Sequence, residues 1–313
     1  RLSDVMNITK LPDEKLIEAY KAGFIYTHII KDGYRLNVGE NGYDTNVDHD
    51  TIGIIASLFT IGDFKDARTL LDTLPKDKSS YDDAMWKYAW PFAIYLYKTG
   101  DAEFVESEFE TIKKNAHKIE ADRVDDGTGI MKTSFAIDNW GQWTIDNFAS
   151  LTGLLSYRYL CEQLGKTGEL QWAQEQYDSL QHAMNTQLAE TVETYGLDYI
   201  PVSMVEPNDA NRCQNPTDAN WASMFLFGRW AWDGYLLGGD QDGIALSMID
   251  DTYAYGFQRL KEAGLPEGTF GSYPGLSTGY NAGYGSAALR GEAYRDSGIK
   301  AYQYMIENTT SAP

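Results

Sequence analysis

The chain has 313 residues, of which 43% are hydrophobic and 23% charged, and its formal net charge is −20 at pH 7. This length and composition suffice for a large buried core, so we predict one globular domain over residues 1–313, which could belong to a longer chain. The negative charge excludes nucleic acid and anionic membrane surfaces as partners, and no apolar run approaches the ~20 residues of a membrane span.

Apolar residues recur at helical spacing along the chain, whereas the alternation typical of strands is nearly absent. A further helix is expected close to the C-terminal end, before the final "NTTSAP". The sequence therefore predicts an all-α fold. The predicted helical stretches, in chain order, are 16–33, 51–63, 84–101, 148–165, 169–188, 220–240 and 245–264.

Four of these stretches end at a glycine that is expected to cap the helix, namely Gly62, Gly100, Gly165 and Gly239. Three of the four glycines are followed directly by an aspartate that can start the next helix. Longer connections rich in Gly, Asp and Asn separate these units. We therefore predict helical hairpins with tight turns at one end of the array and elaborated loops, which carry the function, at the other.

The loop "DNWGQWTIDN" sets two tryptophans, Trp140 and Trp143, among two aspartates, Asp138 and Asp146. Indole rings offer apolar faces for stacking, and carboxylates accept hydrogen bonds from hydroxyl groups. A sugar ring presents both an apolar face and hydroxyl groups. The loop therefore favours a neutral carbohydrate as the ligand.

Cleavage of a glycosidic bond requires two carboxyl groups, one protonated and one ionised. We expect Asp138 to be the proton donor because it lies two residues from Trp140. Asp146 is the second candidate, although its place before Phe148 also suits a helix cap. Glu206, held in an extended segment by the following proline, is the third candidate.

The hairpin pattern resembles the six-hairpin glycosidases, whose fold is an (α/α)6 barrel, and the loop at 138–143 is similar to the acid-bearing loop of their glucoamylase-like members. Asp138 and Trp140 fall on the Asp and Trp of that family. The family's general acid falls on Gly141 and its neighbour on Gln142. The resemblance therefore implies a hydrolase that uses another carboxyl as the acid, or a sugar-binding relative without catalysis.

The stretch "YDTNVDHDTIG" resembles the loop and second helix where this superfamily holds its sugar, and Asp48 and Asp50 match those polar positions. Capping of the helix by Asp50 is the structural alternative. Adjacent Asp and His residues lack the spacing of a metal site, and we expect no metal or cofactor. Aromatic residues expected to contact the sugar are Trp86, Trp140, Trp143, Trp221 and Tyr280.

Other enzymes of the same barrel shape are the remaining alternatives. Four histidines are few for an epimerase, and the acidic charge disfavours a lyase acting on uronates. The catalytic base of the glucoamylase type comes late and could lie beyond residue 313. The opening "RLSDVM" lacks an initiating Met, which favours a processed secreted or periplasmic form. Cys161, in an apolar helical pattern, is expected to be a buried thiol; the sugar, its anomer and the oligomeric state are left open.

Overall fold

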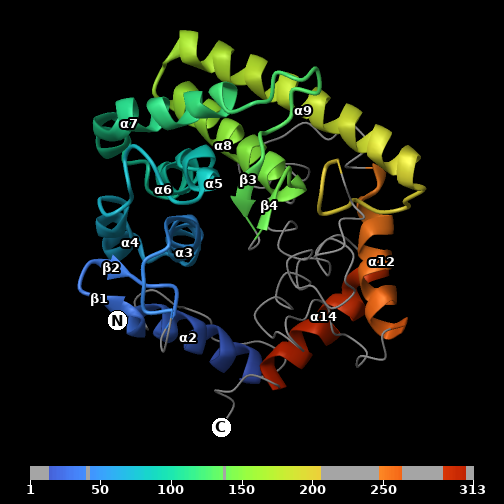
Figure 1. Cartoon of the computed structure of the whole chain (residues 1–313). Coiled ribbons are helices and arrows are strands. Elements are labelled where there is room, and N and C mark those ends of the chain that lie inside the picture. The colour runs from blue at the N-terminus through green and yellow to red at the C-terminus, as the bar shows by residue number, and fades with distance from the viewer. Residues whose placement is uncertain (1–13, 40–42, 137–138, 206–246, 263–291, 308–313) are drawn as a thin grey trace. The chain divides into compact units, whose positions relative to one another are not determined.

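The computed structural model describes residues 14–39, 43–136, 139–205, 247–262 and 292–307, and these residues are predominantly helical (Figure 1). The prediction of an all-α chain is therefore confirmed for this part. Its helices and strands are α2 (Glu14–Ile29), β1 (Lys31–Asp32), β2 (Arg35–Leu36), α3 (Asp48–Ile61), α4 (Phe64–Leu71), α5 (Asp82–Trp86), α6 (Ala89–Thr99), α7 (Ala102–Ala121), β3 (Ser134–Ala136), β4 (Asn139–Gly141), α8 (Thr144–Gln163), α9 (Thr167–Tyr195), α12 (Ile249–Glu262) and α14 (Glu292–Glu307).

The chain divides into two compact units, each built from two separate segments. Unit 1 comprises Arg1–Asp122 and Ser150–Asp178, and unit 2 comprises Arg123–Ala149 and Ser179–Pro313. The chain passes from unit 2 to unit 1 after residue 149, inside the long helix α8. It returns to unit 2 after residue 178, inside the long helix α9. The predicted stretch at 220–240 lies outside the described residues.

Unit 1 is an array of helices in which α3 packs against α4, α5 and α6, and α7 packs against α5 and α6. In Figure 1, α3 and α6 form one layer, and α4 and α7 lie beside it as a second. Every residue of α6 from Ala89 to Leu96 is buried. A helix that is apolar on all sides is covered on all sides, so α6 is the centre of this core.

The predicted tight turns are present between α3 and α4, between α6 and α7, and between α8 and α9. Gly62, Gly100 and Gly165 adopt the left-handed conformation, with φ angles of 97°, 70° and 68°. Asp101 then caps α7, because its Oδ1 accepts a hydrogen bond from the backbone nitrogen of Phe104 at 3.2 Å. The three glycines therefore end their helices as expected, whereas of the two aspartates that follow, only Asp101 makes a capping hydrogen bond and Asp63 does not. Gly239 lies outside the described residues.

Longer connections follow α2, α4 and α7, and two of them contain short antiparallel hairpins, β1–β2 and β3–β4. The alternation of tight and long connections predicted from the sequence is thus confirmed from α2 to α9. The segment at 125–128 in the third connection is a turn. Gly127 and Gly129 have positive φ there, and the Asp126 carboxylate accepts hydrogen bonds from Thr128.

The predicted helix at 84–101 is interrupted. The first piece, α5, ends at Trp86, and α6 begins at Ala89. Pro91 is the physical reason, because a continuous helix would need its backbone N–H to bond the carbonyl of Lys87, and proline has no N–H. The break places Pro91 in the first turn of α6, where proline is tolerated.

The break brings the backbone of α5 against α8. A Cβ atom built on Gly153 of α8 would lie 1.9 Å from the carbonyl oxygen of Trp86. No residue other than glycine fits this helix crossing without moving one of the two backbones. The Trp86 side chain is almost fully buried in the same region, and its Nε1 donates to Asp122 at 2.9 Å.

Helices α7, α8 and α9 meet at Glu169 in the first turn of α9. Its carboxylate accepts hydrogen bonds from Lys113 at 2.6 Å, His117 at 2.8 Å and the hydroxyl of Tyr157 at 2.9 Å. Burial opposes ionisation, but these three donors outweigh it and lower the pKa of Glu169 to about 2. His117 thus belongs to a cluster of side chains from α7, α8 and α9.

Cys161 on α8 is a buried thiol, as predicted. Burial, reinforced by the nearby Glu169 carboxylate, raises the pKa of Cys161 to about 12. The thiol is therefore protonated at neutral pH and unreactive while the helices around it stay packed. Its pairing with Cys213 is untested, because Cys213 lies outside the described residues.

In unit 2, residues 199–204 join the start of α8 to α12. The hydroxyl of Thr144 donates to the carbonyl of Pro201 at 2.6 Å, and the backbone nitrogen of Ile200 donates to the Thr252 hydroxyl at 2.9 Å. No helix within the described ranges is long and apolar enough to cross a membrane.

We predict that Gly153→Ala lowers the free energy of unfolding by about 2 kcal/mol or more, because the new methyl group overlaps the Trp86 carbonyl. Gly53→Ala is the matched control, since Gly53 also lies inside a helix but nothing is within 4 Å of an added Cβ. The control should gain up to about 1 kcal/mol from better helix propensity. Urea unfolding of both variants measures the difference, and equal changes would refute the close crossing.

Candidate functional site

The first turn of α3 carries Asp48, His49 and Asp50, of which Asp48 and Asp50 are predicted to bind sugar. The helix begins at Asp48, so its N-cap is Val47 and not Asp50, and the N-cap makes no side-chain hydrogen bond. The capping role expected for Asp50 is therefore wrong. Its carboxylate is left to face solvent, with 43% of the side chain exposed.

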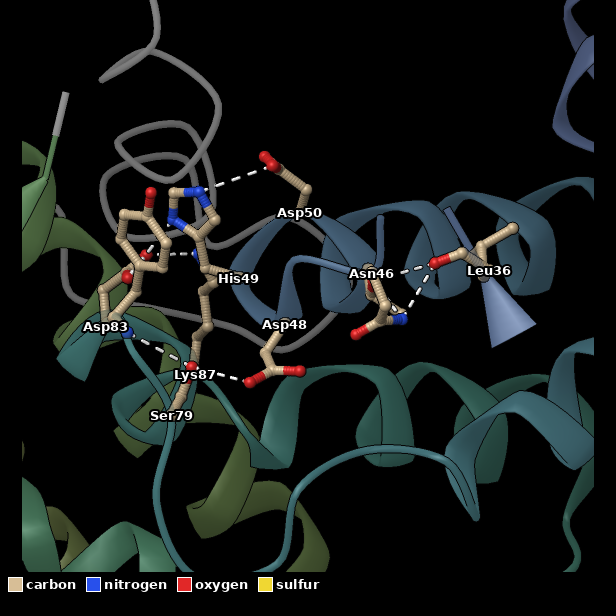
Figure 2. Close-up of polar contacts among 10 residues, drawn as sticks. Leu36, Asn46, Asp48, His49, Asp50, Ser79, Asp83 and Lys87 are labelled. Carbon is tan, nitrogen blue, oxygen red and sulfur yellow. Dashed lines mark hydrogen bonds and ion pairs between the residues drawn. The ribbon is translucent and has the colours of Figure 1, made fainter. Parts of the chain in front are cut away.

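The loop in front of α3 is braced by hydrogen bonds. The amide nitrogen of Asn46 donates to the carbonyl of Leu36 at 2.8 Å and lies 3.0 Å from the Thr51 hydroxyl (Figure 2). On the other side, the hydroxyl of Ser79 donates to Asp48 at 2.8 Å. Asp48 thus holds the α4–α5 connection through Ser79. His49, next to it, contacts Asp50 and Asp83 instead.

A buried ion pair lies at the start of α5. Lys87 Nζ is 2.5 Å from Asp83 Oδ2, and the two side chains are 3% and 8% exposed. A buried charge is stable only when it is paired, so each of these residues depends on the other. Burial alone would raise the pKa of Asp83, but Lys87 and His49 hold it well below its usual value.

His49 links this buried pair to solvent. Its Nδ1 lies 3.3 Å from Asp83 Oδ1, and its Nε2 lies 3.4 Å from Asp50 Oδ2 (Figure 2). The imidazole also stacks on the ring of Tyr81, with centroids 4.1 Å apart and planes inclined by 12°. We call the five residues Asp50, His49, Tyr81, Asp83 and Lys87 the His49 cluster.

The charges within the His49 cluster are set by their contacts. Burial lowers the pKa of His49, but the carboxylates of Asp50 and Asp83 outweigh burial and raise it to about 9. His49 is therefore an imidazolium at neutral pH, donating toward both carboxylates. Asp83 thus faces two cations, Lys87 and His49, and His49 in turn faces the more exposed Asp50 carboxylate.

The second predicted loop forms the β3–β4 hairpin of unit 2. Trp140 on β4 is paired with Phe135 on β3, their ring centroids are 5.6 Å apart, and the indole is 64% exposed. Trp143, in contrast, is 2% exposed. Of the two tryptophans predicted to stack on a sugar, Trp140 has an open ring and Trp143 packs in the core.

The same hairpin explains the glycine at position 141. A Cβ atom on Gly141 would lie 2.5 Å from Cζ2 of Trp143. The indole of Trp143 is anchored by its Nε1, which donates to the carbonyl of Asn139 at 3.3 Å. A side chain at position 141 would therefore collide with Trp143, so this position cannot hold a carboxylic acid without repacking of the loop.

Asp146 lies in the first turn of α8 and is 1% exposed. Its carboxylate accepts a hydrogen bond from the hydroxyl of Ser134 on β3. The helix begins at Thr144, earlier than the start expected near Phe148, so Asp146 is not its N-cap. The buried carboxylate ties β3 to α8 and does not face a solvent-exposed ligand.

Trp86, also predicted to contact a sugar, is 1% exposed and has no open ring face. The remaining predicted site residues lie outside the described residues, so their roles stay predictions. They are the candidate acids Asp138 and Glu206 and the aromatic residues Trp221 and Tyr280.

Sequence reasoning missed Asp83, Lys87 and Tyr81. The spacing of Asp83 and Lys87, four residues apart on a helix, is a recognisable signal for an ion pair. Such pairs are usually solvent-exposed, and the spacing alone does not distinguish a buried one. The aromatic and apolar residues that follow, "YAWPFAIYL", are the available sign that this pair enters the core.

No family model matches the chain. No curated protein matches it either. The function therefore has to be inferred from the residues and their geometry.

We predict that His49 stabilises the fold most below pH 6.5 and that this contribution disappears as the pH rises through 9. The reason is that the folded protein holds the proton more tightly than the unfolded chain, by up to about 3 kcal/mol. The difference in unfolding free energy between wild type and His49→Gln should shrink from pH 6 to pH 10. His182→Gln, at an exposed position of α9, should show no such trend; a flat difference for His49→Gln would refute the assignment.

Proposed function

We propose that this chain is a glycoside hydrolase that acts on a neutral oligo- or polysaccharide. The observation that carries the proposal is the His49 cluster, in which a buried lysine and aspartate orient an imidazolium that in turn fixes a solvent-facing carboxylate, Asp50. This cluster stands at the α3 loop where the resemblance to six-hairpin glycosidases predicts sugar-binding carboxylates.

The energetics of the cluster support a binding role. Buried ion pairs seldom stabilise a fold more than apolar residues of the same volume would, because burial removes both charges from water. A buried charged network that ends at an exposed group is instead typical of a functional site, where the buried members fix the exposed one. Asp50, held in this way, is a preorganised acceptor for the hydroxyl groups of a sugar.

The exposed indole of Trp140 supports the same ligand class. A tryptophan that is 64% exposed on a short hairpin presents an apolar ring to solvent. Such a face stacks on the C–H side of a sugar ring, and the chain's net charge of −20 favours a neutral ligand over an anionic one.

The architecture proposed for the enzyme is the (α/α)6 barrel. The hairpins α3–α4, α6–α7 and α8–α9, each closed by a tight glycine turn, are the repeating unit of such a barrel. The longer connections before α3, α5 and α8 carry the His49 cluster and the β3–β4 hairpin. Loops of this kind at one end of a barrel are where its active site is expected.

Catalysis in this proposal rests on carboxyl groups outside the described residues. One acid has to protonate the leaving oxygen, and one carboxylate has to act as base or nucleophile. Asp138 and Glu206 remain the candidates, whereas the burial of Asp146 and its bond to Ser134 argue against that residue.

A sugar-binding protein without hydrolase activity is the second candidate function. It is favoured by Gly141, which stands where the resembling family has its acid and where Trp143 leaves no room for a side chain. Binding without cleavage would fit a loop that has been repacked around tryptophan in place of an acid.

We predict that Asp50→Asn weakens binding of a neutral oligosaccharide by about tenfold or more, because a charge-assisted hydrogen bond to the sugar is lost. Asp44→Asn removes the same charge from an exposed position of the same loop and should leave affinity unchanged. Quenching of tryptophan fluorescence by gluco-, manno-, galacto- and xylo-oligosaccharides measures binding. If none of these sugars binds the wild-type protein, the carbohydrate proposal fails.

We further predict that Asp138→Asn abolishes release of reducing ends from a natural glycoside while sugar binding and melting temperature are retained. A lost proton donor is felt least with an activated aryl leaving group, so partial activity on an aryl glycoside is expected. Glu206→Gln is the comparison variant. If the wild type binds sugars and cleaves none of them, the second candidate function is the correct one.

A further inference from the structure

A second charged cluster in unit 1 joins α2 to the start of α4. Nε2 of His28 lies 2.9 Å from Oδ2 of Asp63, although the two residues are 35 positions apart along the chain. Asp66, one turn further along α4, lies beside them. One ligand atom from each of the three residues lies within 4.8 Å of the other two.

From this geometry we infer that His28, Asp63 and Asp66 form a binding site for a divalent transition-metal ion of the Zn²⁺ type. One imidazole nitrogen and two carboxylate oxygens are a ligand set that zinc accepts, with a remaining position for water. Tetrahedral ligands about 2.1 Å from one ion lie about 3.4 Å apart, so ligand atoms that are within 4.8 Å of one another need to approach by up to about 1.4 Å to close on it. The inference does not depend on the proposed sugar chemistry.

Two of the ligands are held in position before any ion binds. The His28 ring packs edge-on against Phe24, with centroids 4.5 Å apart, and Phe24 is itself buried. Asp63 is 3% exposed and stands at the N-cap of α4, yet its side chain makes no capping hydrogen bond to that helix. Its carboxylate is turned toward His28 instead, which is the orientation a shared metal ion requires.

The third ligand is open to exchange. Asp66 is partly exposed, and its Oδ2 accepts a hydrogen bond from Lys31 at 3.2 Å. A single lysine contact of this kind is weak compared with a metal–carboxylate bond. The Lys31 ammonium group therefore competes with a divalent ion for the Asp66 carboxylate and is displaced when the ion binds.

The sequence does not reveal this cluster, because His28 is 35 positions from Asp63 along the chain. Ligand spacing can be judged from sequence only among near neighbours such as Asp48, His49 and Asp50. The tight turn at Gly62 is what directs Asp63 and Asp66 toward α2. A search for ligands at short spacing therefore passes over this site.

The test is calorimetric titration of the full, EDTA-treated and dialysed chain with ZnCl₂ in a non-coordinating buffer. Wild type should bind one equivalent tightly, and both His28→Gln and Asp66→Asn should weaken binding by at least about tenfold. Lys31→Met should strengthen binding about two- to fivefold, because the competing ammonium group is gone. His182→Gln, at an exposed histidine elsewhere, is the matched control and should leave binding unchanged.

Asp66→Asn keeps the buried His28–Asp63 pair, so it should fold even if His28→Gln does not. Co²⁺ provides a second readout, since its visible absorption should appear in wild type and be lost in Asp66→Asn. The inference is overturned if wild type binds no Zn²⁺, or if Asp66→Asn binds it as tightly as wild type. Neither the Zn²⁺ titration nor the Co²⁺ spectrum measures sugar binding or cleavage. A negative result for metal binding therefore leaves the proposed function unaffected.

Discussion

The interruption of the helix at Lys87 is the constraint on which both the packing of unit 1 and the geometry of the His49 cluster depend. Because Pro91 cannot donate to the Lys87 carbonyl, the chain turns there and α5 ends at Trp86. The end of α5 leaves the Trp86 carbonyl against Gly153 of α8, and Lys87, directly after it, pairs with Asp83 one turn back. The break before Pro91 thus lies beside both a close helix crossing and a buried ion pair.

The two charged clusters of unit 1 differ in how they meet solvent. In the His49 cluster the cations are internal and the exposed end is a carboxylate, Asp50, so the cluster presents a fixed hydrogen-bond acceptor. Around His28 the buried member is a carboxylate, Asp63, and the partly exposed members are Asp66 and the Lys31 ammonium group that it contacts. The first arrangement suits a neutral polar ligand, and the second suits a cation.

The sequence predicted the helices, the glycine turns and the alternation of short and long connections, because these depend on local pattern. The predictions that failed concern features set by contacts between residues far apart along the chain. The break before Pro91 was hidden by a continuous apolar pattern, and the burial of Trp86, Trp143 and Asp146 depends on neighbours far along the chain. The acid position at Gly141 was recognised as unusual from the sequence, but its cause, the Trp143 ring, required coordinates.

The buried thiol of Cys161 allows the opening of the junction between α7, α8 and α9 to be followed by chemical labelling. With a pKa of about 12 and no exposure, this thiol reacts with a labelling reagent only when the helices above it separate. In a chain whose Cys213 is replaced by serine, the rate of labelling would be the rate at which that junction opens. Labelling of Cys161 thus reports local unfolding at the contacts made by Glu169.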